Sequence, residues 1–164
     1  MSGIQFICYV HPEPQGSAKG FPIRRANGKM GVSITTDNKK LKPFRHAITQ
    51  VAMIALQEAN ATTPLAGKHV PVSLEINCYF AKPPSAPKKR DYPAVKPDAD
   101  KLARAIFDAL TGVLFADDAQ VVQLKIGKYY GTPERVEVTM LALGTTEDHP
   151  VLSKTDEILR YIPF

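Results

Sequence analysis

Four stretches of the chain alternate apolar and polar residues with a period of two, which is typical of β-strands that bury one face. These stretches cover residues 4–10, 70–80, 121–130 and 135–143. The stretch over 70–80 is long, and we expect it to lie in the centre of a sheet. The last two stretches are separated by Gly131, Thr132 and Pro133. We therefore expect these two to form a hairpin.

Two other segments repeat their apolar residues at the helical spacing of three and four. The first has them at Leu41, Phe44, Ile48, Val51, Ala52, Ala55 and Leu56. Because proline is tolerated only in the first turn of a helix, Pro43 predicts that this helix begins near Lys42. Its candidate capping residues are Thr36, Asp37 and Asn38.

The second helical segment has its apolar stripe at Leu102, Ala105, Ile106, Ala109 and Leu110. Pro97 disfavours helix at the residue before it, so we expect the chain to arrive extended and Asp100 to be the N-cap. In an extended segment, Asp98 and Asp100 would point to the same side, roughly 6.5 Å apart. Gly112 predicts the end of the helix.

Basic residues accompany turn signals in the N-terminal part of the chain. An Asn-Gly pair predicts a hairpin over residues 21–36, with Arg24 and Arg25 near its tip. The preceding loop, over residues 11–20, is rich in proline and glycine and carries Lys19. This loop is either a phosphate grip or a simple surface connection.

The order of elements predicts one α+β domain, in which a mixed sheet is packed by two main helices. The 164 residues fit a single core. We assign this domain to residues 1–144 and treat 145–164 as a C-terminal tail with a short helix. No apolar run is long enough to cross a bilayer and no signal-peptide pattern is present, so we expect a cytoplasmic protein. Cys8 and Cys78 fall in strands and are expected to be buried, reduced thiols.

The net charge of +5 indicates a polyanionic partner. Within this basic chain, Asp98, Asp100, Asp117 and Asp118 are gathered in one short region. Each pair alone is typical of a helix cap or a solvated turn. Together they predict a site for Mg²⁺, with Mn²⁺ as a substitute, because hard divalent cations prefer carboxylate oxygens. No His and Cys residues are spaced to favour zinc instead.

A basic, proline-rich segment over residues 81–97 leads directly to Asp98. Its candidate DNA-binding residues are Lys88, Lys89, Arg90 and Lys96. Prolines keep such a segment extended and semi-rigid, and its cations suit a nucleic-acid backbone. A mobile surface loop is the alternative interpretation.

The residue pattern over 98–110 and 117–121 resembles the RusA family of Holliday junction resolvases. The matching motifs are Asp98-Ala99-Asp100-Lys101-Leu102, Ala105-Ile106-Phe107-Asp108-Ala109-Leu110 and Asp117-Asp118-Ala119-Gln120-Val121. The resemblance implies that Asp98, Asp100 and Asp118 are the metal-binding catalytic acids and that Asp117 is an auxiliary ligand. It also implies a RusA-like fold and a homodimer with two acidic sites.

The chain departs from the family pattern at two basic positions. Arg104 stands where the family usually has a lysine needed for activity, and Lys101 stands where it often has asparagine. Arginine keeps the positive charge but does not donate a proton at ordinary pH. We therefore expect Arg104, a catalytic candidate, and Lys101, a candidate DNA contact, to neutralise charge on the phosphate.

These observations lead to the hypothesis of a Mg²⁺-dependent, structure-specific endonuclease. It would resolve Holliday junctions by paired symmetric nicks in DNA recombination and repair, with branched DNA and a second copy as partners. No membrane or organic cofactor is expected, and phage or bacterial origin would be usual for the family. One alternative is a junction-binding protein that does not cut. Another is a metal-dependent nucleotidyl or glycosyl transferase, which the lack of a glycine-rich phosphate loop counts against.

Overall fold

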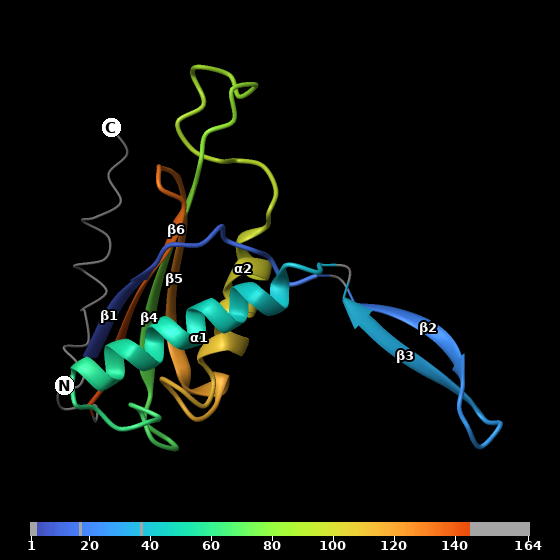
Figure 1. The fold of residues 1–164 in the computed structure, drawn as a ribbon. Helices are drawn as coiled ribbons and strands as arrows, with labels where there is room; N and C mark the ends of the chain where they lie inside the picture. The colour runs from blue at the N-terminus through green and yellow to red at the C-terminus, as the bar shows by residue number, and fades with distance from the viewer. Residues whose placement is uncertain (1–2, 17, 37, 145–164) are drawn as a thin grey trace, which may run out of the picture.

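Two helices pack on a four-stranded mixed sheet, and a separate two-stranded hairpin extends away from it (Figure 1). The computed structural model describes residues 3–16, 18–36 and 38–144. Its elements are β1 (Gly3–Cys8), β2 (Ala18–Arg24), β3 (Met30–Thr36), α1 (Leu41–Glu58), β4 (Val72–Phe80), α2 (Ala99–Leu110), the 3₁₀ turn η1 (Asp118–Gln120), β5 (Val121–Tyr130) and β6 (Arg135–Ala142). The α+β class, the mixed sheet and the two main helices are confirmed. The tail over 145–164 and its expected helix lie outside the described residues.

The sheet has the strand order β1-β6-β4-β5, which confirms that β4 is an inner strand. β4 pairs with β6 in the antiparallel sense and with β5 in the parallel sense. The expected hairpin between β5 and β6 is wrong, because β4 lies between them. A parallel pair needs a crossover connection, and α2 provides it. The chain then crosses the end of β4, where the Gly131 amide donates to the Phe80 carbonyl at 2.9 Å.

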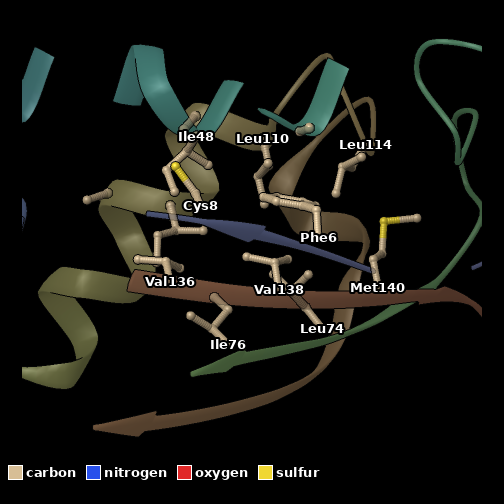
Figure 2. Close-up of a cluster of buried hydrophobic side chains, with 14 of the residues drawn as sticks. Phe6, Cys8, Ile48, Leu74, Ile76, Leu110, Leu114, Val136, Val138 and Met140 are labelled. Atoms are coloured by element: carbon tan, nitrogen blue, oxygen red, sulfur yellow. The ribbon is translucent and has the colours of Figure 1, made fainter. Parts of the chain in front are cut away.

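The core lies between one face of the sheet and both helices. Alternate residues of β4 and β6 are buried, as the period-two pattern predicts. Figure 2 shows Phe6, Leu74 and Val138 of this face meeting Ile48 of α1 and Leu110 of α2. Cys8 and Cys78 belong to the same cluster, and both thiols are free and buried as expected. Burial raises the pKa of both, that of Cys78 to about 12.

The long helix α1 begins at Leu41, so Pro43 falls in its first turn, where proline is tolerated. Its N-cap is Lys40, which makes no side-chain cap. Of the expected capping residues, Asn38 instead closes the preceding turn, since its Oδ1 accepts from the Lys40 amide at 3.0 Å. The side chains of Thr36 and Asp37 lie outside the described part of the chain.

The expected hairpin is present as β2 and β3, and its turn lies where the Asn-Gly pair predicts. Gly28 has a φ of +77°, a value that glycine adopts without strain. The turn is closed by two backbone hydrogen bonds, from Gly28 to the Arg25 carbonyl at 2.8 Å and from Arg25 to the Lys29 carbonyl at 2.9 Å. Arg24 and Arg25 are exposed near the tip, and the hairpin extends away from the sheet (Figure 1). No helix found in the described residues is long and apolar enough to span a membrane.

Candidate active site and nucleic-acid interface

Asp98 and Asp100 lie at the N-terminal end of α2, but not in the expected conformation. Asp98 is the N-cap residue, with an extended backbone at φ −74° and ψ 141°, and Asp100 is already inside the first turn. The expected N-cap at Asp100 is therefore wrong. Pro97 restricts only the residue before it, so the helix is free to begin at Ala99. The two carboxylates thus lie at a helix N-terminus, where the helix dipole favours negative charge.

Basic residues and an N-terminal loop surround Asp98. Lys101 Nζ lies 3.2 Å from Asp98 Oδ2, one helical turn away. A pocket of about 440 Å³ is lined by both residues, by Lys96 and by residues of the 11–16 loop. That loop is fixed to the helix, because the Gln15 amide donates to the Lys101 carbonyl at 2.9 Å. This end of α2 therefore combines carboxylate with cations that can hold a phosphate.

The loop is also held by an arginine of α1. Arg45 Nη2 donates to the Gln15 side chain and to the Asp108 carboxylate of α2. One guanidinium therefore ties the loop and both helices together. Asp108 is part of the family pattern, and its contact with Arg45 shows that it helps to hold α1 and α2 together.

The proline-rich segment is anchored to the end of β5. Lys128 Nζ donates to the carbonyls of Val95 and Pro97, at 2.8 Å each. Lys82 Nζ donates to the Lys88 carbonyl at 3.1 Å, which stabilises the segment from within. The strand pattern is compatible with a DNA contact by Lys128 or with a polar strand face, and it does not reveal a bond to a distant carbonyl. The anchoring places a cation-rich segment directly before Asp98.

The other two acids belong to η1, at the start of β5. Asp117 is a capping residue: its Oδ1 accepts from the Ala119 amide at 2.9 Å, and its own amide donates to Gln120 Oε1 at 2.9 Å. Gln120 Nε2 in turn donates to the carbonyls of Gly67 and Val70. Asp118 is exposed beside this cap. Asp117 thus caps η1, which is the structural role that the sequence pattern also allowed for it.

Within one chain the two pairs of acids lie at opposite ends of α2. At about 1.5 Å per residue, the 12 residues of this helix span about 18 Å. Asp98 directly precedes α2, whereas Asp117 and Asp118 follow the turn after its other end. In the described part of the chain, no three His, Cys, Asp or Glu side chains are grouped to hold a metal ion. A single chain therefore does not bring these two pairs of aspartates together, because α2 lies between them.

The remaining predicted site residues fall into three places. Arg104 is exposed on α2, one turn beyond Asp100. Lys88 and Lys89 are exposed in the proline-rich segment, whereas Arg90 is half-buried. Arg24 and Arg25 lie on the projecting hairpin. Lys19 lies in β2, paired with Thr35, and its side chain is outside the described part.

A histidine–glutamate pair that sequence reasoning missed lies beside the same end of α2. His11 Nδ1 is 2.8 Å from Glu134 Oε2, and the Ala81 amide donates to Glu134 Oε1 at 3.0 Å. Partial burial acts to raise the pKa of Glu134, but these two hydrogen bonds outweigh it and the pKa is lowered. The pair joins three connections that are distant in the sequence. Its members are 123 positions apart, so no local pattern could reveal it.

A comparison with protein families identifies the class to which this chain belongs. A family model described as "Endodeoxyribonuclease RusA" matches residues 13–141, well over half of the chain. The chain belongs to this RusA family, which confirms the resemblance. A relative in Bacillus subtilis (strain 168), the uncharacterised protein YqaN, is 34% identical over 148 residues, covering 84% of this chain and 95% of the relative.

Proposed function

We propose that this protein is a Mg²⁺-dependent endonuclease that cuts four-way DNA junctions with paired, symmetric nicks during recombination and repair. The observation that carries the proposal is the placement of Asp98 and Asp100 at a helix N-terminus, directly after a basic segment, in a chain of the RusA family. The carboxylates would hold the metal, and the basic segment would hold the polyanion that carboxylates repel.

The separation of the acids extends this proposal to two copies of the chain. Carboxylates that bind one Mg²⁺ have their oxygens within about 2.1 Å of the ion, so they cannot lie at opposite ends of α2. A two-fold axis that pairs two α2 helices in antiparallel orientation would bring Asp118 of a second copy to Asp98 and Asp100. The exposed face of α2, with Asp100 and Arg104, is available for this pairing. Such a homodimer has two equivalent sites, which suits two symmetric cuts.

The chain's own residues then divide the work. Asp98 and Asp100 of one copy and Asp118 of the other provide hard oxygen ligands, and Asp117 keeps Asp118 in place through its cap. Arg104, one turn from Asp100, neutralises charge on the scissile phosphate. When bound, the ion supplies a water of lowered pKa and stabilises the oxygens of an in-line displacement.

The basic residues at this end of α2 hold the substrate. Lys96 and Lys101 line the pocket beside Asp98 and contact the phosphates on either side of the cut. Lys88, Lys89 and Arg90 extend the contact along one arm of the junction. Arg24, Arg25 and Lys19 of the hairpin reach a second arm. Since these contacts go to phosphates, they position the DNA without reading its sequence.

The test is a labelled synthetic four-way junction, incubated with Mg²⁺ and then with EDTA. Wild-type protein is expected to give paired nicks in Mg²⁺ and none in EDTA. Asp98→Asn is expected to bind the junction without cutting it. Asp91→Asn, which removes the same charge from the exposed loop, is the matched control and should cut as wild type. Full activity of Asp98→Asn, or no metal-dependent nicks by the wild type, would refute the proposal.

A second candidate function is a junction-binding protein that does not cut. The observation that favours it is the separation of the two acid pairs within one chain. Such a protein would bind four-way junctions equally in EDTA and in Mg²⁺ and leave them intact. Sedimentation of the protein separates the candidates further, since a monomer could not assemble the acidic site.

A further inference from the structure

A row of planar side chains crosses the face of the sheet opposite to the helices. Tyr79 of β4 and Tyr129 of β5 stack with ring centroids 5.3 Å apart and planes inclined by 29°. The Arg135 guanidinium lies over the other side of Tyr79, 3.6 Å from the ring centroid. Tyr92 of the proline-rich segment follows Tyr129, at 6.2 Å between centroids. We call Arg135, Tyr79, Tyr129 and Tyr92 the aromatic row.

Glycines make room for these rings to lie flat on the strands. A Cβ at Gly127 would lie 2.5 Å from the Tyr129 ring, and a Cβ at Gly131 would lie 2.9 Å from the Tyr79 ring. Real Cβ atoms do not approach other atoms so closely, so any other residue would displace a ring. Glycine is otherwise unfavourable within a strand, and it often marks close approach of another group.

The aromatic row contributes nothing to the hydrophobic core. Its strand residues alternate with the buried Cys78, Phe80 and Val136, so they point to the opposite face. Within the described residues, both helices pack on the buried face. Tyr92 is 64% exposed at the end of the row. Cross-strand stacking explains the Tyr79–Tyr129 pair, but it does not require an exposed ring at the end.

The surroundings of the row favour a nucleic acid over another ligand. Tyr92 lies in the basic segment that carries Lys88 and Lys89, so the row joins a run of cations at its exposed end. Lys125, whose side chain is 71% exposed and pairs with Glu75 at 3.0 Å, lies four residues before Tyr129 on the same face. Aromatic rings beside a basic groove are the arrangement with which proteins bind single strands, since every base has a face that stacks.

We propose that the aromatic row binds unpaired DNA bases by stacking on Tyr92 and Tyr129. The basic segment follows the phosphates of the same strand. This inference rests on DNA being the ligand of the proposed function, but it needs neither the metal nor the cut. A four-way junction offers such bases when its centre opens, and the row lies at the same end of the sheet as Asp98, because Lys128 anchors Pro97 there.

The experiment measures binding of a fluorescent oligothymidylate to the full chain by anisotropy in EDTA, which prevents cutting. Stacking is worth about 1–3 kcal/mol per base, so Tyr92→Leu and Tyr129→Leu should each weaken binding by about 5- to 150-fold. Tyr92→Phe and Tyr129→Phe keep the rings and should bind as wild type. Since Tyr92 is exposed in a loop, its variants leave the core intact.

An abasic strand of the same length is the matched probe, because it has the same charge and no bases. The leucine variants should bind it as wild type does. Unchanged oligothymidylate binding by both leucine variants, or an equal loss on the abasic strand, would overturn the inference. If the wild type cuts the junction but the leucine variants bind oligothymidylate as it does, only the proposed role of the aromatic row is refuted. If the leucine variants lose binding but the wild type does not cut, only the proposed nuclease activity is refuted.

Discussion

Asp98→Asn and Asp118→Asn are each expected to be inactive as homodimers, and a dimer with one copy of each is expected to regain activity. If each site takes Asp98 and Asp100 from one copy and Asp118 from the other, one site of this heterodimer carries both substitutions. The second site then carries none. Symmetry thus predicts about half of the wild-type rate for the first nick, and products with single instead of paired nicks.

The distance between the two acid pairs of one chain follows from the length of α2. Its span of about 18 Å separates Asp98 from Asp118 within one chain, far beyond the reach of one ion. A site built from a single chain would carry one substitution in each half of the heterodimer. Its activity would then not exceed that of either variant alone.

The assay uses two affinity tags, so that only heterodimers survive two purification steps, followed by cutting of a labelled junction in Mg²⁺. The heterodimer of Asp98→Asn with Asp100→Asn is the matched control. Both acids come from the same end of α2, so both of its sites carry a substitution and it should stay inactive. An inactive heterodimer of Asp98→Asn with Asp118→Asn would refute the composite site.

Three further predictions concern stability and reactivity. Ile106→Ala, at a side chain that is 0% exposed, should cost about 2–5 kcal/mol in urea unfolding, whereas Ile54→Ala, at a side chain 52% exposed on α1, should cost far less; equal costs would contradict the core described here. Since burial raises the pKa of Cys8 and Cys78, both thiols should react with Ellman's reagent at pH 8 only after denaturation. The lowered pKa of Glu134 means that its stabilising effect is present above the ordinary glutamate pKa and is lost as pH falls through the folded value. The difference in melting temperature between wild type and Glu134→Gln should therefore be largest near neutral pH and should shrink below about pH 4; a constant difference would contradict this.

The sequence predicts local structure well because local patterns determine it. The strand over 121–130 has the bounds that its alternation indicates, but its expected buried face is wrong, because Val122 and Leu124 are exposed. The Asn-Gly turn of the hairpin lies as expected. The pairing of β5 with β4 could not be predicted in this way. It depends on where α2 packs, and that is decided by contacts between residues far apart in the sequence.

The residues of the candidate site stay a prediction from the motif, and their geometry could not be predicted at all. The motif names Asp98, Asp100 and Asp118, and the helix between them is also expected, yet the sequence does not reveal that the chain after the helix stays at its far end, where Gln120 bonds to the Gly67 and Val70 carbonyls. The structural task of Asp117 was hidden for a similar reason, because its cap depends on Gln120 bonding to the Gly67 and Val70 carbonyls. Sequence spacing suits an ion ligand and a helix cap equally well.

The two bonds from Lys128 to the proline-rich segment have a consequence for the geometry of cutting. β5 begins three residues after Asp118, at the end of η1, and holds Pro97 near its other end, so one strand fixes both acid pairs relative to each other. In a dimer with composite sites, this strand and α2 would fix the distance between the two sites, and therefore between the two nicks. The enzyme would then cut only a DNA whose two scissile phosphates lie at that distance from each other.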